Sequence, residues 1–582
     1  MRVVERAVYE RLTERLRRLY GEKDLPRLVN RLDLLVGRYG VGNCPDEHCR
    51  EELWDQRDAV LITYGDMVRG VEESPLPSLL RFVEQHLGDA VSAVHLLPFF
   101  PYSSDDGFSV IDYREVDPAL GNWEDIQALS GSYRLMADLV INHVSAKSAW
   151  FRNYGNGVAP ERHYFIEMDP QTDLSAVTRP RTTPLLRPAQ TPWGERHLWA
   201  TFSHDQIDLD FRNPDVLFEF LDILLLYVHH GVDIIRLDAI AYLWKEIGTS
   251  CIHLPETHEV VKLLRDVLEM LVPGVILITE TNVPHRENVS YFGDADEAHL
   301  VYQFSLPPLL LHALETGESR YLVEWATNLE PPPRGCSFFN FTASHDGIGV
   351  RPLEGLLPDD ELHALVDCIE QKGGKVSRRT NPDGSQTPYE LNITYFDALS
   401  FPGRKDSDLC IARFLCSQTI MLSLQGIPGI YFNSLIAAPN WLAGVQESDR
   451  ARTINRQKWG MDELEGLLQD PTHAASRVFR EYVRRLRIRG GHAAFHPDGP
   501  QQVLKLPAGL FGIKRTSPDG AEVLWVVANL TIEPVGVQPG RIDRHFRKKA
   551  WYELIQGWSA AGNDLERLQL SPYQVLWLVG RS

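Results

Sequence analysis

The sequence predicts an α/β protein, a (β/α)8 TIM barrel with inserted lid domains and a C-terminal antiparallel β domain. Eight short apolar runs rich in Val and Ile alternate with helix-like stretches between residues 59 and 432. Continuous apolar runs of this length are typical of buried parallel strands, and eight such β/α units suffice to close a barrel. From about residue 499 the pattern changes to runs in which apolar and polar residues alternate, as in antiparallel strands.

The predicted strands follow one another along the chain with amphipathic helices between them. In the helix expected over 257–271, Val260, Leu264 and Val267 fall on one face, which is the spacing of a helix that packs on a sheet. A second such helix is expected over 214–230. The eight strand runs are AVLITY (59–64), VSAVHLLP (91–98), RLMADLVI (134–141), VDIIRLDA (232–239), VILITE (275–280), HLVYQF (299–304), FFNFTASH (338–345) and IPGIYF (427–432).

Two stretches interrupt this alternation and set the expected domain limits. One contains the Pro- and Arg-dense segment RPRTTPLLRPAQTPWG, and the other contains the turn-rich segment KGGKVSRRTNPDGSQTPYE. Long loops in a compact enzyme usually form lids or substrate walls. We expect an N-terminal helical extension (1–55), a catalytic barrel (56–143, 205–346 and 401–498), an inserted domain B (144–204), an inserted lid after strand seven (347–400) and a C-terminal β domain (499–582).

The composition excludes several classes of function. The chain has 582 residues and a formal net charge of −20, whereas nucleic acids and anionic membranes require a cationic surface. Neither a signal peptide nor an apolar run of ~20 residues is present, so we expect a cytoplasmic protein with no membrane and no nucleic-acid partner. The seven cysteines are too sparse for a disulfide framework, and Cys44 and Cys49 have no second Cys/His pair at zinc-site spacing nearby.

Three carboxylates stand at the ends of predicted strands. Asp238 ends IIRLD, Glu280 ends LITE and Asp346 follows FTASH. Arg236 lies two residues before Asp238, and His345 lies directly before Asp346. Catalytic groups of a (β/α)8 barrel lie at the carboxyl ends of its strands. We therefore expect the three carboxylates in one site.

Asp238 and Glu280 end neighbouring predicted strands. Such strands are ~4.8 Å apart, close to the ~5–5.5 Å between the two carboxyl groups of a retaining glycosidase. One carboxylate would attack the anomeric carbon of a sugar, and the other would protonate the leaving oxygen. Arg236 points to the same side of its strand as Asp238 and is expected to keep that carboxylate ionised. The apolar neighbours of Glu280 favour a raised pKa, as an acid requires.

These segments resemble the alpha-amylase superfamily, glycoside hydrolase family 13, through the motifs DLVINH (138–143), IIRLDAI, ITET and ASHD. The resemblance implies that Asp238 is the nucleophile and Glu280 the acid/base. It implies that Asp346 binds sugar hydroxyls and stabilises the transition state, and that His143 and His345 hold glucose hydroxyls. Members of this family often bind calcium near the Asn of the first motif. The insert here lacks an Asp cluster that would complete such a site, so we expect no metal and no cofactor.

Within the superfamily the chain is most similar to the sucrose phosphorylase branch, through SSDDGFSVIDY, ETNVPHRENVSYFG and ASHDGIGVRPLEGLL. By that resemblance Asp105 and Arg456 clamp the far hydroxyls of a glucosyl unit, with Asp106 as a competing candidate for the first position. The resemblance also implies apolar walls of Phe108, Phe202 and Tyr242, with Tyr242 on the side of the acceptor. Gln206 would lie near the reaction centre, and Arg236 is expected among the residues that bind the glucosyl unit.

A phosphorylase cleaves its glucosyl-enzyme with phosphate, and a dianion in a carboxylate-lined site needs compensating cations. Arg179 and Arg181 of the RPR segment can supply them, because a guanidinium group binds phosphate or carboxylate through two hydrogen bonds. Tyr389 and Glu390 correspond to positions that shape the acceptor site in this branch. Glu390 departs from the amide found there, which argues against fructose as the acceptor.

The whole chain is most similar to the glucosylglycerate phosphorylase subgroup, through its helical extension and the runs DPQTDLSAVTRPR and LVYQFSLPPLLLHAL. The resemblance implies a retaining phosphorylase that converts 2-O-α-D-glucosylglycerate and inorganic phosphate into α-D-glucose 1-phosphate and D-glycerate. A sucrose or sucrose 6-phosphate phosphorylase, and an α-glucoside hydrolase or transglucosidase, remain alternatives.

Overall fold

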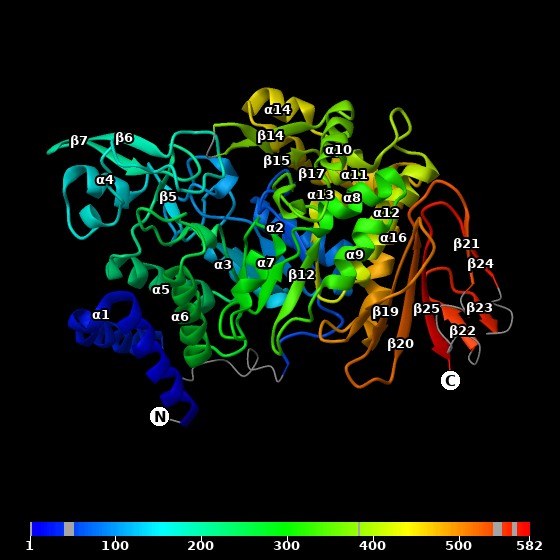
Figure 1. The fold of residues 1–582 in the computed structure, drawn as a ribbon, viewed down its shortest axis with the longest axis horizontal. Coiled ribbons are helices and arrows are strands. Elements are labelled where there is room, and N and C mark those ends of the chain that lie inside the picture. The colour runs from blue at the N-terminus through cyan, green and yellow to red at the C-terminus, as the bar shows by residue number, and fades with distance from the viewer. Residues whose placement is uncertain are drawn as a thin grey trace.

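The computed structural model of the chain describes residues 3–39, 52–381, 384–538, 540, 550–561 and 567–581. Its elements surround a closed eight-stranded barrel, with helix α1 on one side and the C-terminal sheet on the other (Figure 1). Cys44 and Cys49 lie outside the described residues. A search of the described helices finds none with the length and apolar character needed to cross a membrane.

The barrel strands are parallel and almost wholly buried, and each overlaps one of the predicted runs, with β12 beginning one residue before its run. Their order around the barrel is β1–β16–β12–β11–β10–β9–β4–β3, so the predicted (β/α)8 barrel is confirmed. Runs of Val, Ile and Leu suit these strands because neighbouring elements cover both of their faces. The strands are β1 (Val60–Thr63), β3 (Ala93–Leu96), β4 (Arg134–Leu139), β9 (Val232–Leu237), β10 (Ile276–Thr279), β11 (Leu300–Tyr302), β12 (Ser337–Phe341) and β16 (Ile427–Tyr431).

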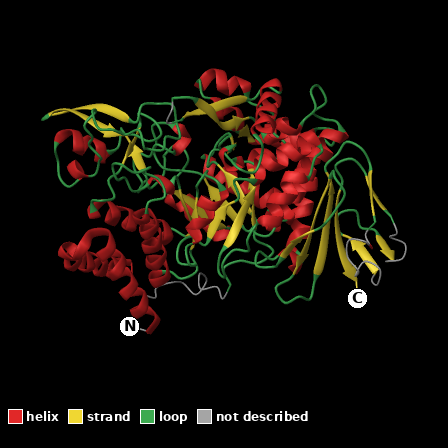
Figure 2. Cartoon of the chain, viewed as in Figure 1, coloured by secondary structure: helices red, strands yellow, loops and turns green. Residues whose placement is uncertain are grey.

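Helices cover the outside of the barrel (Figure 2). In α6 (Pro255–Leu271) the proline stands in the first turn, where its missing N–H costs nothing, and Val260, Leu264 and Val267 are buried on one face. The other barrel helices are α2 (Pro75–His86), α3 (Trp123–Ser132), α5 (Pro214–His229), α8 (Leu306–Thr316), α12 (Asp408–Ser423) and α16 (Ala474–Gly490). Shorter elements are β2 (Val68–Arg69), α7 (His285–Val289), α9 (Arg320–Asn328), α11 (Tyr395–Leu399), α13 (Phe432–Leu435), α14 (Leu442–Ser448), β17 (Trp459–Gly460) and α15 (Met461–Gln469).

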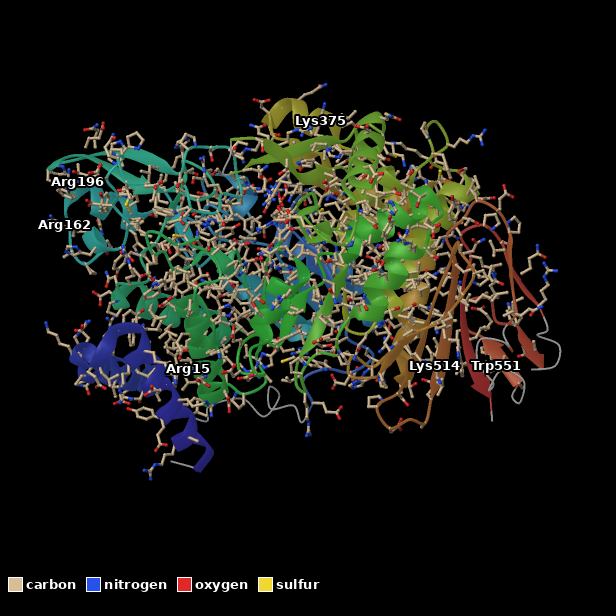
Figure 3. The ribbon with its side chains drawn as sticks, viewed as in Figure 1. Arg15, Arg162, Arg196, Lys375, Lys514 and Trp551 are labelled. Carbon is tan, nitrogen blue, oxygen red and sulfur yellow. The ribbon has the colours of Figure 1, made fainter. Side chains whose placement is uncertain are left out.

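The N-terminal helix α1 (Val3–Tyr39) packs on α5 and α6 (Figure 1). It changes direction at Gly21, whose φ of 77° is open to glycine at little cost. Leu12, Leu16 and Leu28 form its buried face. Arg15, labelled in Figure 3, lies on this helix. Its Nε is 2.5 Å from Oδ2 of Asp266 on α6. The extension is therefore joined to the barrel by apolar packing and by charge.

Two inserts stand above the carboxyl ends of the strands. The first, between β4 and β9, contains β5 (His143–Ser145), α4 (Ala149–Asn156), β6 (Leu186–Thr191), β7 (Gly194–Trp199) and β8 (Gln206–Asp208). The second follows β12 and contains β13 (Ile348–Gly349), α10 (Asp359–Gln371), β14 (Lys375–Thr380) and β15 (Gln386–Asn392). In the second insert these strands form a three-stranded sheet with the order β13–β15–β14, so this polar, turn-rich stretch has regular structure of its own.

The C-terminal strands form an antiparallel sheet of six, in the order β18–β19–β20–β25–β22–β23, and a separate pair, β21–β24. The C-terminal antiparallel fold expected from the alternating pattern is thus confirmed. The limits drawn from the sequence for the five domains stay a prediction. The strands are β18 (Gln501–Val503), β19 (Leu510–Thr516), β20 (Val523–Asn529), β21 (Val535–Val537), β22 (Ala550–Glu553), β23 (Ser559–Ala561), β24 (Leu568–Leu570) and β25 (Val575–Arg581).

Candidate active site

Asp238 and Glu280 stand on neighbouring barrel strands. β9 pairs with β10 so that Leu237 lies opposite Thr279, and each carboxylate is the next residue along its strand. The backbone N–H of Glu280 donates to the carbonyl of Leu237 at 3.1 Å, and that of Ala239 donates to Oε2 of Glu280 at 3.2 Å. The register of two adjacent parallel strands therefore brings the two carboxyl groups side by side.

Arg236 connects this pair to a third carboxylate beneath it. Its Nη1 donates to Oδ1 of Asp238 at 2.8 Å and also contacts Asp138, while Nη2 lies 3.9 Å from Oε2 of Glu280. His95 lies 2.7 Å from Asp138 through its Nε2. Sequence reasoning did not select His95, although a histidine inside the apolar run VSAVHLLP was a usable signal.

The surroundings of the two carboxyl groups set their protonation. Burial raises the pKa of Glu280 to about 7, and the charges of Asp238 and Asp346 act in the same direction, while Arg236 opposes the rise. At neutral pH, Glu280 is thus able both to donate and to accept a proton. This agrees with the raised pKa expected from the apolar neighbours of Glu280.

The pKa of Asp238 is shifted in the same direction as that of Glu280. Burial raises its pKa above the ordinary value, and Arg236 acts in the expected direction but does not cancel the rise. The physical reason is that Arg236 is shared: its guanidinium also serves Asp138, whose own charge disfavours ionisation of Asp238.

Asp346 lies among cations at the end of β12. Arg452 approaches its Oδ1 at 2.8 Å and Arg456 at 3.7 Å, and Nε2 of His345 lies 3.3 Å from its Oδ2. Burial alone would raise the pKa of Asp346, but these neighbours, Arg452 foremost, hold it well below its ordinary range. Burial lowers the pKa of His345 to about 3, so its ring is neutral at neutral pH. The ring of Phe108 stacks on it at 4.6 Å.

The acidic doublet expected at the far end of the glucosyl pocket contacts Arg456. Nη1 of Arg456 lies 2.6 Å from Oδ2 of Asp106 and 3.5 Å from Oδ1 of Asp105. Asp106 is therefore the closer partner, whereas Asp105 lines the cavity above the catalytic carboxylates. Both residues have positive φ, 54° for Asp105 and 49° for Asp106, which is uncommon for residues with a side chain and frequent at functional sites.

His143 and Gln206 come together from the two paired strands at the root of the first insert. Nε2 of His143 lies 2.9 Å from the carbonyl oxygen of Phe108, and Nε2 of Gln206 donates to the same oxygen at 3.1 Å. The ring of Phe202 lies 5.3 Å from that of His143 and 5.4 Å from that of Tyr242. The aromatic residues of the cavity are therefore in contact with its polar residues His143 and Gln206.

Most of the residues predicted for the site line one cavity. Arg236 and Arg456 do not line the cavity themselves. Arg236 contacts Asp238 and Arg456 contacts Asp105, and both of these carboxylates line it. The predicted residues that line the cavity are Asp105, Phe108, His143, Arg181, Phe202, Gln206, Asp238, Tyr242, Glu280, His345, Asp346, Tyr389 and Glu390.

The two arginines of the RPR segment line different pockets. The guanidinium of Arg181 lies 5.1 Å from the ring of Tyr389 and 5.9 Å from that of Phe202, within the cavity. Arg179 does not line this cavity; its Nη2 donates to the carbonyl of Thr183, and the residue borders another pocket. The predicted shared role of the two arginines at one anion is therefore not supported for Arg179, because the loop turns its side chain to the other pocket.

Arg452 is the principal residue that sequence reasoning missed. Besides contacting Asp346, it donates to both carboxylate oxygens of Glu390, from Nη2 at 2.5 Å and from Nε at 3.0 Å. Glu390 is buried, and a buried carboxylate requires such a partner. The carboxylate of Glu390 is thus neutralised by an arginine 62 residues further along the chain.

The buried residues Asn142 and Asp208 both contact the ammonium group of Lys245. Nζ of Lys245 lies 2.8 Å from Oδ1 of Asn142 and 2.6 Å from Oδ2 of Asp208. Among the described residues no cluster of three or more His, Cys, Asp or Glu side chains could hold a metal ion. The ammonium group of Lys245 therefore supplies positive charge at these oxygens.

Comparison with known proteins agrees with this geometry. The chain matches the family model of the alpha-amylase catalytic domain over residues 83–330. It is 45% identical to a glucosylglycerate phosphorylase of Allomeiothermus silvanus, over 98% of this chain and 98% of that protein. It is 44% identical to a glucosylglycerate phosphorylase of Escherichia coli, over 98% of this chain and 100% of that protein.

A solved structure supports the same assignment. The structure of sucrose 6F-phosphate phosphorylase from Thermoanaerobacter thermosaccharolyticum superposes with a TM-score of 0.71 at 26% identity, over 83% of this chain and 95% of that chain. The paired carboxylates at the strand ends, the barrel that carries them and the full-length similarity to these enzymes lead to one conclusion. The chain belongs to the alpha-amylase superfamily and, within it, to the family of glucosylglycerate phosphorylases.

Proposed function

We propose that the protein catalyses reversible phosphorolysis of 2-O-α-D-glucosylglycerate, giving α-D-glucose 1-phosphate and D-glycerate with retention of configuration. The observation that carries the chemistry is the pair Asp238 and Glu280 on adjacent strands, with the pKa of Glu280 raised to about 7. The similarity to glucosylglycerate phosphorylases over 98% of the chain supports this acceptor.

In the first half-reaction Asp238 attacks the anomeric carbon, and Glu280 transfers its proton to the oxygen of the departing glycerate. In the second, an oxygen of phosphate attacks the same carbon, Glu280 takes up the phosphate proton, and the bond to Asp238 breaks. Asp346, which the neighbouring arginines keep ionised, binds sugar hydroxyls and opposes the positive charge that develops on the ring.

The glucosyl unit would lie between Asp105, Phe108, His143 and His345, with Phe202 and Gln206 bordering it. Arg236 and Arg456 hold the carboxylates of this pocket in place.

Arg181 is the proposed ligand of the anionic co-substrates. Among the described residues it has no carboxylate within ion-pair distance, and it faces the cavity beside Tyr389. One guanidinium could serve phosphate in one half-reaction and the glycerate carboxylate in the other, because the two anions enter in turn. Tyr242 and the pair of Glu390 with Arg452 would complete the acceptor wall. We propose a cytoplasmic enzyme that acts on small molecules and needs no cofactor and no nucleic-acid or membrane partner.

The decisive experiment is synthesis from α-D-glucose 1-phosphate with D-glycerate, fructose and fructose 6-phosphate as separate acceptors. The rate of each reaction is measured as the rate at which phosphate is released. Fast release with D-glycerate alone is the expected result. Release with fructose or fructose 6-phosphate would assign the protein to sucrose or sucrose 6-phosphate phosphorolysis. Equal release without any acceptor would mean that water is the acceptor and that the protein is a hydrolase.

The nucleophile is tested with Asp238→Asn. We expect turnover to fall by about 10⁴-fold or more, because no covalent glucosyl-enzyme can form. The structurally similar amide should leave the fold intact, which circular dichroism checks. Substantial remaining activity would show that another group carries the glucosyl unit.

A further inference from the structure

A second pocket, lined by three arginines, lies between the two inserts. It has a volume of about 660 Å³ and is bordered by residues 174–179 and 184–186 of the first insert and by Arg351 and Arg379 of the second. This size is within the range of ~300–1,000 Å³ found for small-molecule sites. None of the residues that line this pocket also lines the catalytic cavity. We call it the interinsert pocket.

The interinsert pocket concentrates positive charge. Arg179, Arg351 and Arg379 line it, and its described lining contains no Asp or Glu. Among the described residues, Glu354 is the one carboxylate that contacts this set, 2.7 Å from Nη2 of Arg379 and with a side chain that is 46% exposed. Because the chain as a whole carries a net charge of −20, three guanidinium groups in one concavity are a local feature that attracts anions.

In the part of the chain that the structure describes, these guanidinium groups are incompletely satisfied by hydrogen bonds. Nε of Arg351 is buried, and no hydrogen-bond partner for it is found among the described residues. Arg179 donates to the carbonyl of Thr183, and Nε of Arg379 donates weakly to the hydroxyl of Thr387 at 3.3 Å. A buried donor without an acceptor costs free energy, and an anion in the pocket would remove that cost.

We propose that the interinsert pocket is a second, non-catalytic site for a small oxyanion, inorganic phosphate or the carboxylate of glycerate. An anion held there would bridge Arg179 of the first insert and Arg351 and Arg379 of the second through charge-assisted hydrogen bonds. It would thereby fasten together the two inserts that contribute Arg181 and Tyr389 to the catalytic cavity. The RPR segment thus serves two anion sites, with Arg181 at one and Arg179 at the other.

The proposal is tested on the full-length protein by thermal unfolding in sodium phosphate and in sodium chloride of equal ionic strength. The difference between the two melting temperatures reports specific anion binding, because a ligand of the folded state stabilises it. The variants are Arg379→Gln, Arg351→Gln and Arg181→Gln, the last to weaken the catalytic anion position. The matched control is Arg378→Gln, which changes the exposed neighbour of Arg379 on β14. Parallel titrations with D-glycerate distinguish the two anions.

We expect Arg379→Gln and Arg351→Gln each to reduce the phosphate-dependent rise in melting temperature by about half, and Arg378→Gln to leave it unchanged. Arg379→Gln and Arg181→Gln should each cause only a partial loss, since no residue lines both pockets. The second site would be overturned if Arg379→Gln and Arg351→Gln both showed the wild-type rise in melting temperature with phosphate. It would also be overturned if Arg181→Gln alone abolished that rise. The readout does not require turnover, so it stands or falls separately from the identity of the acceptor.

Discussion

At the scale of single residues, the proton of Glu280 governs the pH dependence. Because burial raises its pKa to about 7, the acid form required for departure of glycerate is lost as the pH rises through that value. We expect kcat/KM for glucosylglycerate to fall about tenfold per pH unit above pH 7, measured as initial phosphorolysis rates from pH 5 to 9.

An activated donor supplies the control for this profile. With α-D-glucosyl fluoride the leaving group needs no proton, so the decline above neutral pH should disappear. A decline that persists with the fluoride would assign the titration to a group other than Glu280.

Arg452 is expected to matter because two carboxylates depend on it. In Arg452→Gln, Asp346 and Glu390 lose their nearest cation, and the pKa of Asp346 rises. We expect kcat/KM to fall about 100-fold, since an uncompensated buried charge costs several kcal/mol. Adding Glu390→Gln should recover part of the loss, and Arg450→Gln, at an exposed position of the same loop, should have no effect. A drop without recovery in the double variant would contradict the shared role of Arg452.

At the scale of elements, α1 is fastened to α6 by Arg15. Its guanidinium contacts Asp266 at 2.5 Å, Glu259 at 3.2 Å and Asp296 at 3.4 Å. We expect Arg15→Ala to lower the free energy of unfolding by about 2 kcal/mol, less than for a lone buried pair because Arg11 also contacts Asp266. Urea unfolding followed by circular dichroism measures it.

The control for Arg15 lies on the same helix. Arg6 forms an exposed pair with Glu10 at 3.0 Å, and such pairs contribute little, so Arg6→Ala should unfold with the wild-type profile. Neither change should alter kcat/KM, because α1 contributes no residue to the described lining of the catalytic cavity. Equal stability of the two variants would mean that apolar packing alone holds α1.

At the scale of the whole molecule, Arg515 joins the C-terminal sheet to the barrel. It is buried and donates to the carbonyl oxygens of Ser423 at 2.9 Å, His496 at 2.8 Å and Gly499 at 3.2 Å. In Arg515→Met these oxygens lose their hydrogen-bond donor, and we expect the free energy of unfolding to fall by about 3 kcal/mol. Urea unfolding followed by tryptophan fluorescence detects it, with the exposed Lys505→Met as control. If Arg515→Met and Lys505→Met unfolded at the same urea concentration, Arg515 would not stabilise the contact between the C-terminal sheet and the barrel.

The sequence by itself determined the fold and the reacting pair. Each barrel strand is a local apolar run, and the topology of a parallel barrel brings all strand ends to one face. Asp238 and Glu280 could therefore be placed together without coordinates. The lid between β12 and α12 escaped such reasoning in detail, because its small sheet is built from polar residues whose pairing is not encoded in a short-range pattern.

Only the tertiary structure decided which charges meet. Arg452 reaches Glu390 and Asp346 across long stretches of chain, Asp106 rather than Asp105 lies closer to Arg456, and Arg179 turns away from Arg181. Ion pairs between loops depend on where the loops fold in space, and no periodicity of the sequence records that. Apolar periodicity is a local property and can be read from the chain, whereas the partners of buried charges are set by contacts between segments that are distant in sequence.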